Sequence, residues 1–145
     1  MKGIGILLAA GLLLGATPAL AQTVGTCARG GGGNQPQPVW VLFDLASAHI
    51  RAVDKPKIAE AVKTAKDRQV SQLCLLGHTD KLGDKTYNAR LARERAQAVA
   101  AELVRAGYPA KDIVIAADPE AFGNMSLGSR DASEQDRRVT ILFAR

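Results

Sequence analysis

Apolar residues gather in four short runs along the chain, and two longer stretches carry them at helical spacing. The four runs, rich in β-branched and aromatic residues, predict strands at residues 39–43, 70–76, 113–117 and 139–143. In the longer stretches, at residues 50–66 and 87–106, apolar residues recur every three or four positions and predict amphipathic helices. Asp54 is the expected N-cap of the first helix, and Gly107 is expected to end the second.

Strands that alternate with helices at this spacing predict an α/β fold. We expect a two-layer sandwich in the order β-α-β-α-β-(short α)-β, with a small mixed four-stranded sheet that carries the helices on one face. The short helix is expected around residues 127–134, within a stretch rich in Pro, Gly, Asn and Ser. Together these elements predict one folded domain at residues 39–145.

The period of two along the strands places apolar side chains on both faces of this sheet. The face directed away from the helices would carry Trp40, Leu42, Cys74, Leu76, Val114 and Leu142. A face this apolar is not expected to stay bare in a one-sided sheet. We expect either that residues 22–38 fold back across it, pinned by a bond between Cys27 and Cys74, or that a second copy of the chain or another protein covers it.

The first 38 residues differ in composition from the predicted domain. Residues 1–21 combine Lys2, an apolar core and a small-x-small cleavage site, which indicates a secretory signal peptide. Residues 22–38 are rich in Gly, Pro and Gln and predict a flexible segment. After the signal, no segment approaches the roughly 20 apolar residues that a membrane span needs, so we expect no transmembrane segment in the mature chain.

Cysteine usage and charge narrow the function. Export would place Cys27 and Cys74 where disulfides persist; one bridge is the simplest pairing, and an ordinary buried thiol at Cys74 is the alternative. Two Cys and two His without close spacing predict no metal, and we expect no other cofactor. The net charge of +5 is too diffuse to identify an anionic partner, and nucleic-acid binding is not expected without a basic stripe or an aromatic platform.

An acid and a base flank the corner between the second strand and the second helix. Asp80 closes the run Gly77-His78-Thr79-Asp80, and Arg95 lies fifteen residues further on, inside the helix. Such a pair could clamp a zwitterion, form a plain ion pair, or serve catalysis together with His78.

Several separated blocks agree in order and spacing with a known family. They are Phe43-Asp44, Gly77-His78-Thr79-Asp80 with Gly83, Tyr87-Asn88, Leu91, Arg95-Ala96, Leu103-Val104 with Gly107, and Arg137-Arg138-Val139. The chain resembles the OmpA C-terminal-like domain, which also occurs in peptidoglycan-associated lipoproteins and flagellar motor stator proteins. The resemblance covers roughly residues 39–145.

The resemblance implies non-covalent binding of peptidoglycan through the diaminopimelate of its stem peptide, without catalysis. By position, Asp80 would hold the ammonium group of that residue and Arg95 its carboxylate. Further matching positions line or flank the same pocket: Thr79, Asn88, Arg137, Asp44 and Leu91. We therefore expect a domain that tethers the envelope to the cell wall in the periplasm of a Gram-negative bacterium, either free there or associated with the outer membrane.

Alternatives and departures accompany this interpretation. A small hydrolase that uses His78 and Asp80 on wall peptides is the other candidate, although it lacks a convincing nucleophile. Partners at the apolar sheet face could be an outer-membrane or other envelope protein, or a second copy. Lipidation of Cys27, as in related lipoproteins, is disfavoured because Thr26 precedes it. Asp136 and Ser133 replace the usual Asn and basic residue, and the loop after Ala117 departs from the family, so ligand preference could be weaker or altered.

Overall fold

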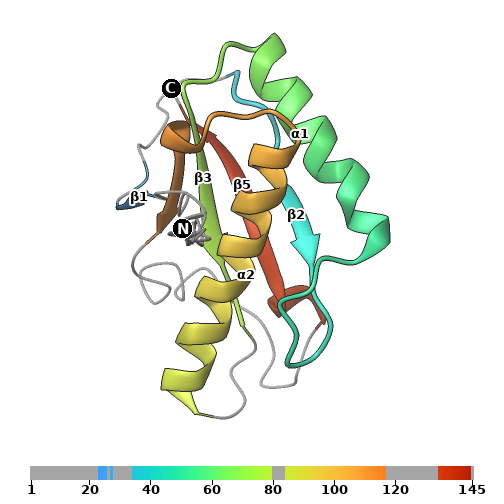
Figure 1. The fold of residues 1–145 in the computed structure, drawn as a ribbon, viewed down its shortest axis with the longest axis vertical. Coiled ribbons are helices and arrows are strands. Elements are labelled where there is room, and N and C mark those ends of the chain that lie inside the picture. Colours follow the sequence, from blue (N-terminus) through green and yellow to red (C-terminus); the bar gives the residue numbers. More distant parts are fainter. Residues whose placement is uncertain (1–22, 26, 28–33, 80–83, 117–133, 145) are drawn as a thin grey trace, which may run out of the picture.

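The structure, a computed structural model, describes residues 23–25, 27, 34–79, 84–116 and 134–144. Its strands are β1 (Thr23–Gly25), β2 (Val39–Leu42), β3 (Gln72–Gly77), β4 (Ile113–Ala116) and β5 (Arg138–Ala144). The helices are α1 (Lys55–Asp67) and α2 (Lys85–Arg105). Short 3-10 turns precede α1, β4 and β5: η1 (Ala52–Asp54), η2 (Ala110–Asp112) and η4 (Glu134–Asp136). Both helices lie on the same side of the sheet (Figure 1).

The sheet has the order β1-β4-β3-β5-β2. β4 runs parallel to β1 and β3, whereas β5 runs antiparallel to β3 and β2. The predicted α/β class, the four strands β2 to β5 in a mixed sheet, and the two helices on one face are confirmed. Most of the expected short helix, around residues 127–134, lies outside the described residues. The described part of the chain resumes at residue 134 with η4.

β1 corrects the prediction that all of residues 22–38 are a flexible segment. Thr23–Gly25 pairs in parallel with β4, from the register of Thr23 on Val114 to that of Gly25 on Ala116. Two β-branched residues open this short run, and a disulfide two residues after it fixes the chain to the sheet. A strand of three residues inside a Gly-rich stretch has too little periodicity to be recognised from sequence.

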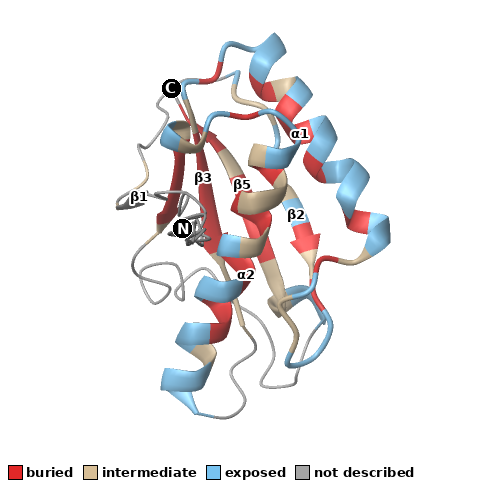
Figure 2. Ribbon diagram, in the orientation of Figure 1, coloured by how far each residue is buried: buried red, intermediate tan, exposed pale blue. Residues whose placement is uncertain are grey.

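The hydrophobic core lies between the helices and the sheet, as the buried segments of Figure 2 show. Strand residues that alternate with outward positions form its floor: Val41, Leu73, Leu75, Ile113, Ile115, Val139, Ile141 and Phe143. The helices cover this floor with Ile58, Ala61, Val62, Ala65, Ala96, Val99, Ala100 and Leu103. The apolar residues that repeat every second position on the strands, and those at helical spacing on the helices, therefore meet at one interface.

The opposite face of the sheet is covered unevenly. A disulfide joins Cys27 to Cys74 with their Cα atoms 5.7 Å apart, which confirms the predicted pairing. β1 lies beside β4, but Cys74 belongs to β3, the next strand. The disulfide therefore links Cys27, two residues after β1, to the strand on the other side of β4. Cys74, Leu76 and Val114 are buried, whereas Trp40 on the edge strand β2 is 48% exposed. The apolar face is therefore covered over β3 and β4 and stays open toward β2.

Asp54 lies at the predicted N-cap of α1, but its carboxylate makes no capping hydrogen bond. Instead Arg51 Nε donates to Asp54 Oδ2 over 2.9 Å, and Lys57 Nζ donates to Oδ1 over 2.6 Å. Arg51 also bonds Glu134 of η4 at 2.7 Å, so the cluster ties the start of α1 to the approach of β5. Burial raises the pKa of Asp54, but the hydrogen bonds from Lys57 and Arg51 outweigh it and hold the pKa below its usual value.

This lowered pKa predicts a loss of stability in acid. A carboxylate with a depressed folded pKa stabilises the protein above its ordinary pKa of 3.8, and the contribution disappears as the pH falls through the folded value. At pH 7 we expect D54N to lower the free energy of unfolding by about 2 kcal/mol, and at pH 2 we expect the two proteins to converge. Urea unfolding at both values measures this difference.

The matched control is D67N, because Asp67 pairs with Lys63 at the surface, where ion pairs contribute roughly 0–1 kcal/mol. D67N should stay close to the unmodified chain at both pH values. A gap between D54N and the unmodified chain that persisted undiminished at pH 2 would show that the charge of Asp54 is not what stabilises this corner.

Candidate functional site

The candidate site lies at one end of the sheet, where several chain segments meet. β2 and β3 both run antiparallel to β5, so their carboxyl ends lie at the same end of the sheet, where β5 begins. The loop after β2, the end of β3, the first half of α2 and η4 converge there, in the lower part of Figure 1. This end of the sheet, called the rim below, brings together the predicted site residues that the structure describes.

Arg95 is the centre of the rim. It projects from α2, is 1% exposed, and is the largest fully buried side chain in the described chain. Its Nε donates to the carbonyl oxygen of Ser47 at 2.8 Å, Nη1 to that of His78 at 3.2 Å and Nη2 to that of Asp44 at 3.1 Å. The guanidinium also lies 5.3 Å from the ring centroid of Phe43, in cation-π geometry. The neighbouring Arg93, in contrast, is exposed.

The loop after β2 is bent so that two of its carbonyl groups meet Arg95. Ser47 N–H donates to the Asp44 carbonyl at 3.2 Å, which closes a turn. Ala46, inside this turn, has a φ of 52°, a conformation uncommon for residues other than glycine. The turn directs the carbonyls of Asp44 and Ser47 toward Arg95. The uncommon backbone conformation of Ala46 thus lies in the turn that supplies two acceptors to this side chain.

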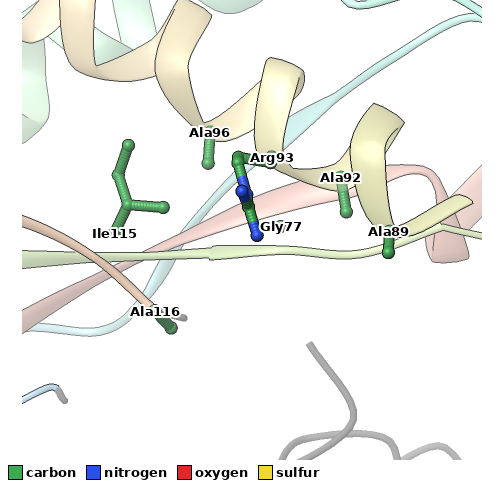
Figure 3. Close-up of a pocket in the computed structure, with 7 residues that line it drawn as sticks. All are labelled: Gly77, Ala89, Ala92, Arg93, Ala96, Ile115 and Ala116. Atoms are coloured by element: carbon green, nitrogen blue, oxygen red, sulfur yellow. The ribbon is translucent and has the colours of Figure 1, made fainter. Parts of the chain in front are cut away.

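Close contact between α2 and β3 sets the position of Arg95 relative to the strand end. A Cβ atom on Gly77 would lie 2.2 Å from the carbonyl oxygen of Ala92, so only glycine allows this approach. Beside the contact is a small hollow, lined on α2 by Ala89, Ala92, Arg93 and Ala96 and on the strands by Gly77, Ile115 and Ala116 (Figure 3). The helix therefore packs almost directly on the strand backbone.

The other predicted site residues fall around this centre. Thr79 and Asn88 are half-buried, Leu91 is buried and Asp44 is exposed. Arg137, just before β5, donates from Nε to the Phe43 carbonyl at 3.3 Å and so reaches the same loop as Arg95. Asp80 lies outside the described residues, as do Ser133 and the loop after Ala116.

His78 extends β3 rather than standing apart as a reactive group. Its backbone N–H donates to the Arg138 carbonyl at 2.8 Å, which continues the ladder to β5. Burial, and after it the positive charge of Arg138, lower the pKa of His78 to about 4, against an opposing effect of Asp136. The imidazole is therefore neutral at physiological pH.

Two features of the site could not be predicted from residue types. Ser47 serves through its carbonyl group, which every residue has, so its identity carries no signal. Arg95 is singled out by its spacing, but its burial among three carbonyls follows from the fold.

In the part of the chain that the structure describes, no cluster of His, Cys, Asp or Glu could hold a metal ion. None of the helices described there has the length and apolar character that a membrane span requires.

Comparisons with known proteins agree with this architecture. The outer-membrane lipoprotein YfiB of Pseudomonas aeruginosa is 34% identical over 86 residues, which cover 59% of this chain and 49% of the lipoprotein. The OmpA-like domain of FopA1 from Francisella tularensis superposes with a TM-score of 0.60 at 23% identity, covering 72% of this chain and 69% of that one. The peptidoglycan-associated lipoprotein of Burkholderia pseudomallei gives 0.61 at 23% identity, covering 72% and 88%.

The two structural likenesses establish the fold, and the sequence match is to an outer-membrane lipoprotein. The chain spans about half the length, or less, of the curated relatives that it matches. The model of the OmpA family matches residues 42–140, which run from the end of β2 into β5 and include the whole rim. The chain therefore belongs to the OmpA family.

Proposed function

We propose that this protein binds peptidoglycan at the rim, through the diaminopimelate of the stem peptide, and tethers the cell envelope to its wall without catalysing a reaction. The observation that carries the proposal is the position of Arg95, a buried cation held by three carbonyl groups at the end of the sheet. Carbonyl groups offer partial charges only, so they fix the orientation of the guanidinium, which keeps its positive charge. A fixed positive charge at this point is suited to a carboxylate.

A free amino-acid end carries both charges, so its recognition needs an acid as well as Arg95. Asp80 is the acid that the family spacing assigns, one residue after the half-buried Thr79 at the end of β3. Asn88 on α2 and Arg137 before β5 add donors from two other sides. Arg95 and Asp80 together would read the carboxylate and the ammonium group of diaminopimelate, and a ligand that lacked either charge would leave one partner unpaired.

The names of the similar proteins support a place in the envelope. One is an outer-membrane lipoprotein and another a peptidoglycan-associated lipoprotein. The signal sequence expected at residues 1–21 and the disulfide between Cys27 and Cys74 both suit an oxidising compartment outside the cytoplasm. We therefore propose that the protein resides in the periplasm of a Gram-negative bacterium.

Sedimentation with purified peptidoglycan sacculi tests the acid. D80N removes the charge that would meet the ammonium group, and truncating one partner of a desolvated charge pair costs about 2–5 kcal/mol, so we expect binding to weaken at least about thirtyfold. D67N is the matched control, since Asp67 is an exposed acid at the far end of α1. Equal sedimentation of D80N and the unmodified chain would contradict the proposed clamp.

The carboxylate contact can be tested without changing the protein. Sacculi that contain lysine in place of diaminopimelate keep the side-chain ammonium group but lack the carboxylate assigned to Arg95. We expect the unmodified chain to bind them about as weakly as D80N binds ordinary sacculi. Equal retention on both kinds of sacculi would show that Arg95 does not read this carboxylate.

The hydrolase alternative receives no support. A general base is most effective when its pKa lies near the working pH, and burial holds the pKa of His78 at about 4. His78 is also fixed in the β3–β5 ladder through its backbone. None of the three similar proteins described above has a name that indicates a hydrolase.

A further inference from the structure

Trp40 is the most exposed aromatic residue in the part of the chain that the structure describes. It is the only tryptophan, it lies on the edge strand β2, and its side chain is 48% exposed. Its neighbours Val41 and Phe43 belong to the core, so the strand period turns Trp40 to the face opposite the helices. Trp40 is therefore not part of the core between the helices and the sheet.

Arg138 and His78 extend Trp40 into a row across three strands. The guanidinium of Arg138, at the start of β5, lies 4.6 Å from the Trp40 ring centroid. His78 follows β3 and pairs with Arg138 through the backbone. Within the described chain, Arg138 Nε is a buried donor without an acceptor, although Nη1 bonds the Gln135 carbonyl. The row formed by Trp40, Arg138 and His78 therefore joins an apolar ring to an unmet hydrogen-bond donor.

The row is continuous with the rim. His78 is followed by Thr79, and Arg138 is preceded by Arg137, so each row residue adjoins a residue of the proposed diaminopimelate site. The Arg137 side chain reaches the Phe43 carbonyl, whereas that of Arg138 lies over Trp40, so the rim and the row lie on different sides of the same sheet end. A polymer held at the rim could reach the row by turning around this end.

We propose that the row binds a sugar ring of the peptidoglycan glycan strand, next to the stem peptide held at the rim. A pyranose has an apolar C–H face that can stack on an indole, and its edge carries hydroxyl and acetamido oxygens that accept hydrogen bonds from a guanidinium. Rotation of the Arg138 side chain toward such an oxygen would satisfy Nε. This inference rests on the proposed function, since the rim must first hold the peptide.

The test compares two soluble probes: the disaccharide-tripeptide unit of the wall, N-acetylglucosaminyl-N-acetylmuramyl-L-Ala-γ-D-Glu-diaminopimelate, and the same tripeptide without sugars. Fluorescence reports on Trp40 alone, because the chain has no other tryptophan. We expect the disaccharide-tripeptide to change the emission and to protect Trp40 from acrylamide quenching. The tripeptide alone should bind, as measured by calorimetry, without either effect.

Calorimetry with variants completes the test. W40A should bind the disaccharide-tripeptide roughly fivefold more weakly, as expected for one lost stacking contact, and bind the tripeptide as the unmodified chain does. V53A is the control, since Val53 is 71% exposed in η1 and outside the row. The proposal is overturned if W40A binds both probes normally, or if both probes alter Trp40 emission equally. Failure of the unmodified chain to bind either probe would instead overturn the proposed function.

Discussion

Replacing Gly77 by alanine is expected to destabilise the protein by about 3 kcal/mol, because overpacking costs of this size follow when backbone must move. The new methyl carbon would lie 2.2 Å from the Ala92 carbonyl oxygen and 2.8 Å from its carbonyl carbon. No side-chain rotation can relieve a contact with helix backbone, so α2 must shift away from β3. Urea unfolding followed by circular dichroism measures the loss, and the melting temperature should fall by roughly 10 °C.

Two further variants make this prediction specific. G25A is the matched control: a Cβ atom there would meet only Val114 Cγ1 at an ordinary 3.8 Å, so we expect a change within about 0.5 kcal/mol. Adding A92G to G77A should give no rescue, because the obstructing atom is a carbonyl oxygen that glycine also has. Stability of G77A equal to that of G25A would show that helix and strand are not in such close contact.

The strand pattern predicted most of the fold because burial of one sheet face leaves a strong mark on sequence. Residues 139–143 were expected as a strand and β5 spans Arg138–Ala144, because Val139, Ile141 and Phe143 all enter the core. The end of α2 could be predicted equally well, from Gly107. Gly107 has a φ of 92° and its N–H donates to the Val104 carbonyl, a conformation that favours glycine after a helix.

Interactions made by the backbone, and most of those between distant residues, were beyond prediction. The disulfide across 47 residues could be predicted because the chain has only two cysteines, but the edge pairing of β1 to β4 leaves no local pattern. At Asp54 the sequence predicted the position but not the partners, since Arg51 and Lys57 compete with the helix backbone for its carboxylate. The same is true of the site: spacing singled out Arg95, but only the fold brings three carbonyl groups to it.

The burial of Arg95 gives it a structural role in addition to the proposed binding role. R95M keeps an unbranched apolar stem but removes the donors of Arg95 from three carbonyls, so that those of Ser47 and His78 lose this partner and that of Asp44 keeps only the Ser47 N–H. Each buried unsatisfied polar group costs about 1–3 kcal/mol, so we expect R95M to lower the free energy of unfolding by roughly 4 kcal/mol. R95K should fall between R95M and the unmodified chain, because lysine keeps the charge and loses the planar fork. Urea unfolding measures all three proteins.

R93M is the control, since Arg93 is exposed on the same helix and should tolerate the change within about 0.5 kcal/mol. Stability of R95M within about 1 kcal/mol of the unmodified chain would contradict the carbonyl cage. A destabilisation of the expected size has a consequence for function. Loss of wall binding in an Arg95 variant would then reflect a collapsed rim as much as a lost ligand contact. D80N and lysine-containing sacculi therefore test the two ligand charges more directly, because neither removes the guanidinium that bonds the three carbonyls.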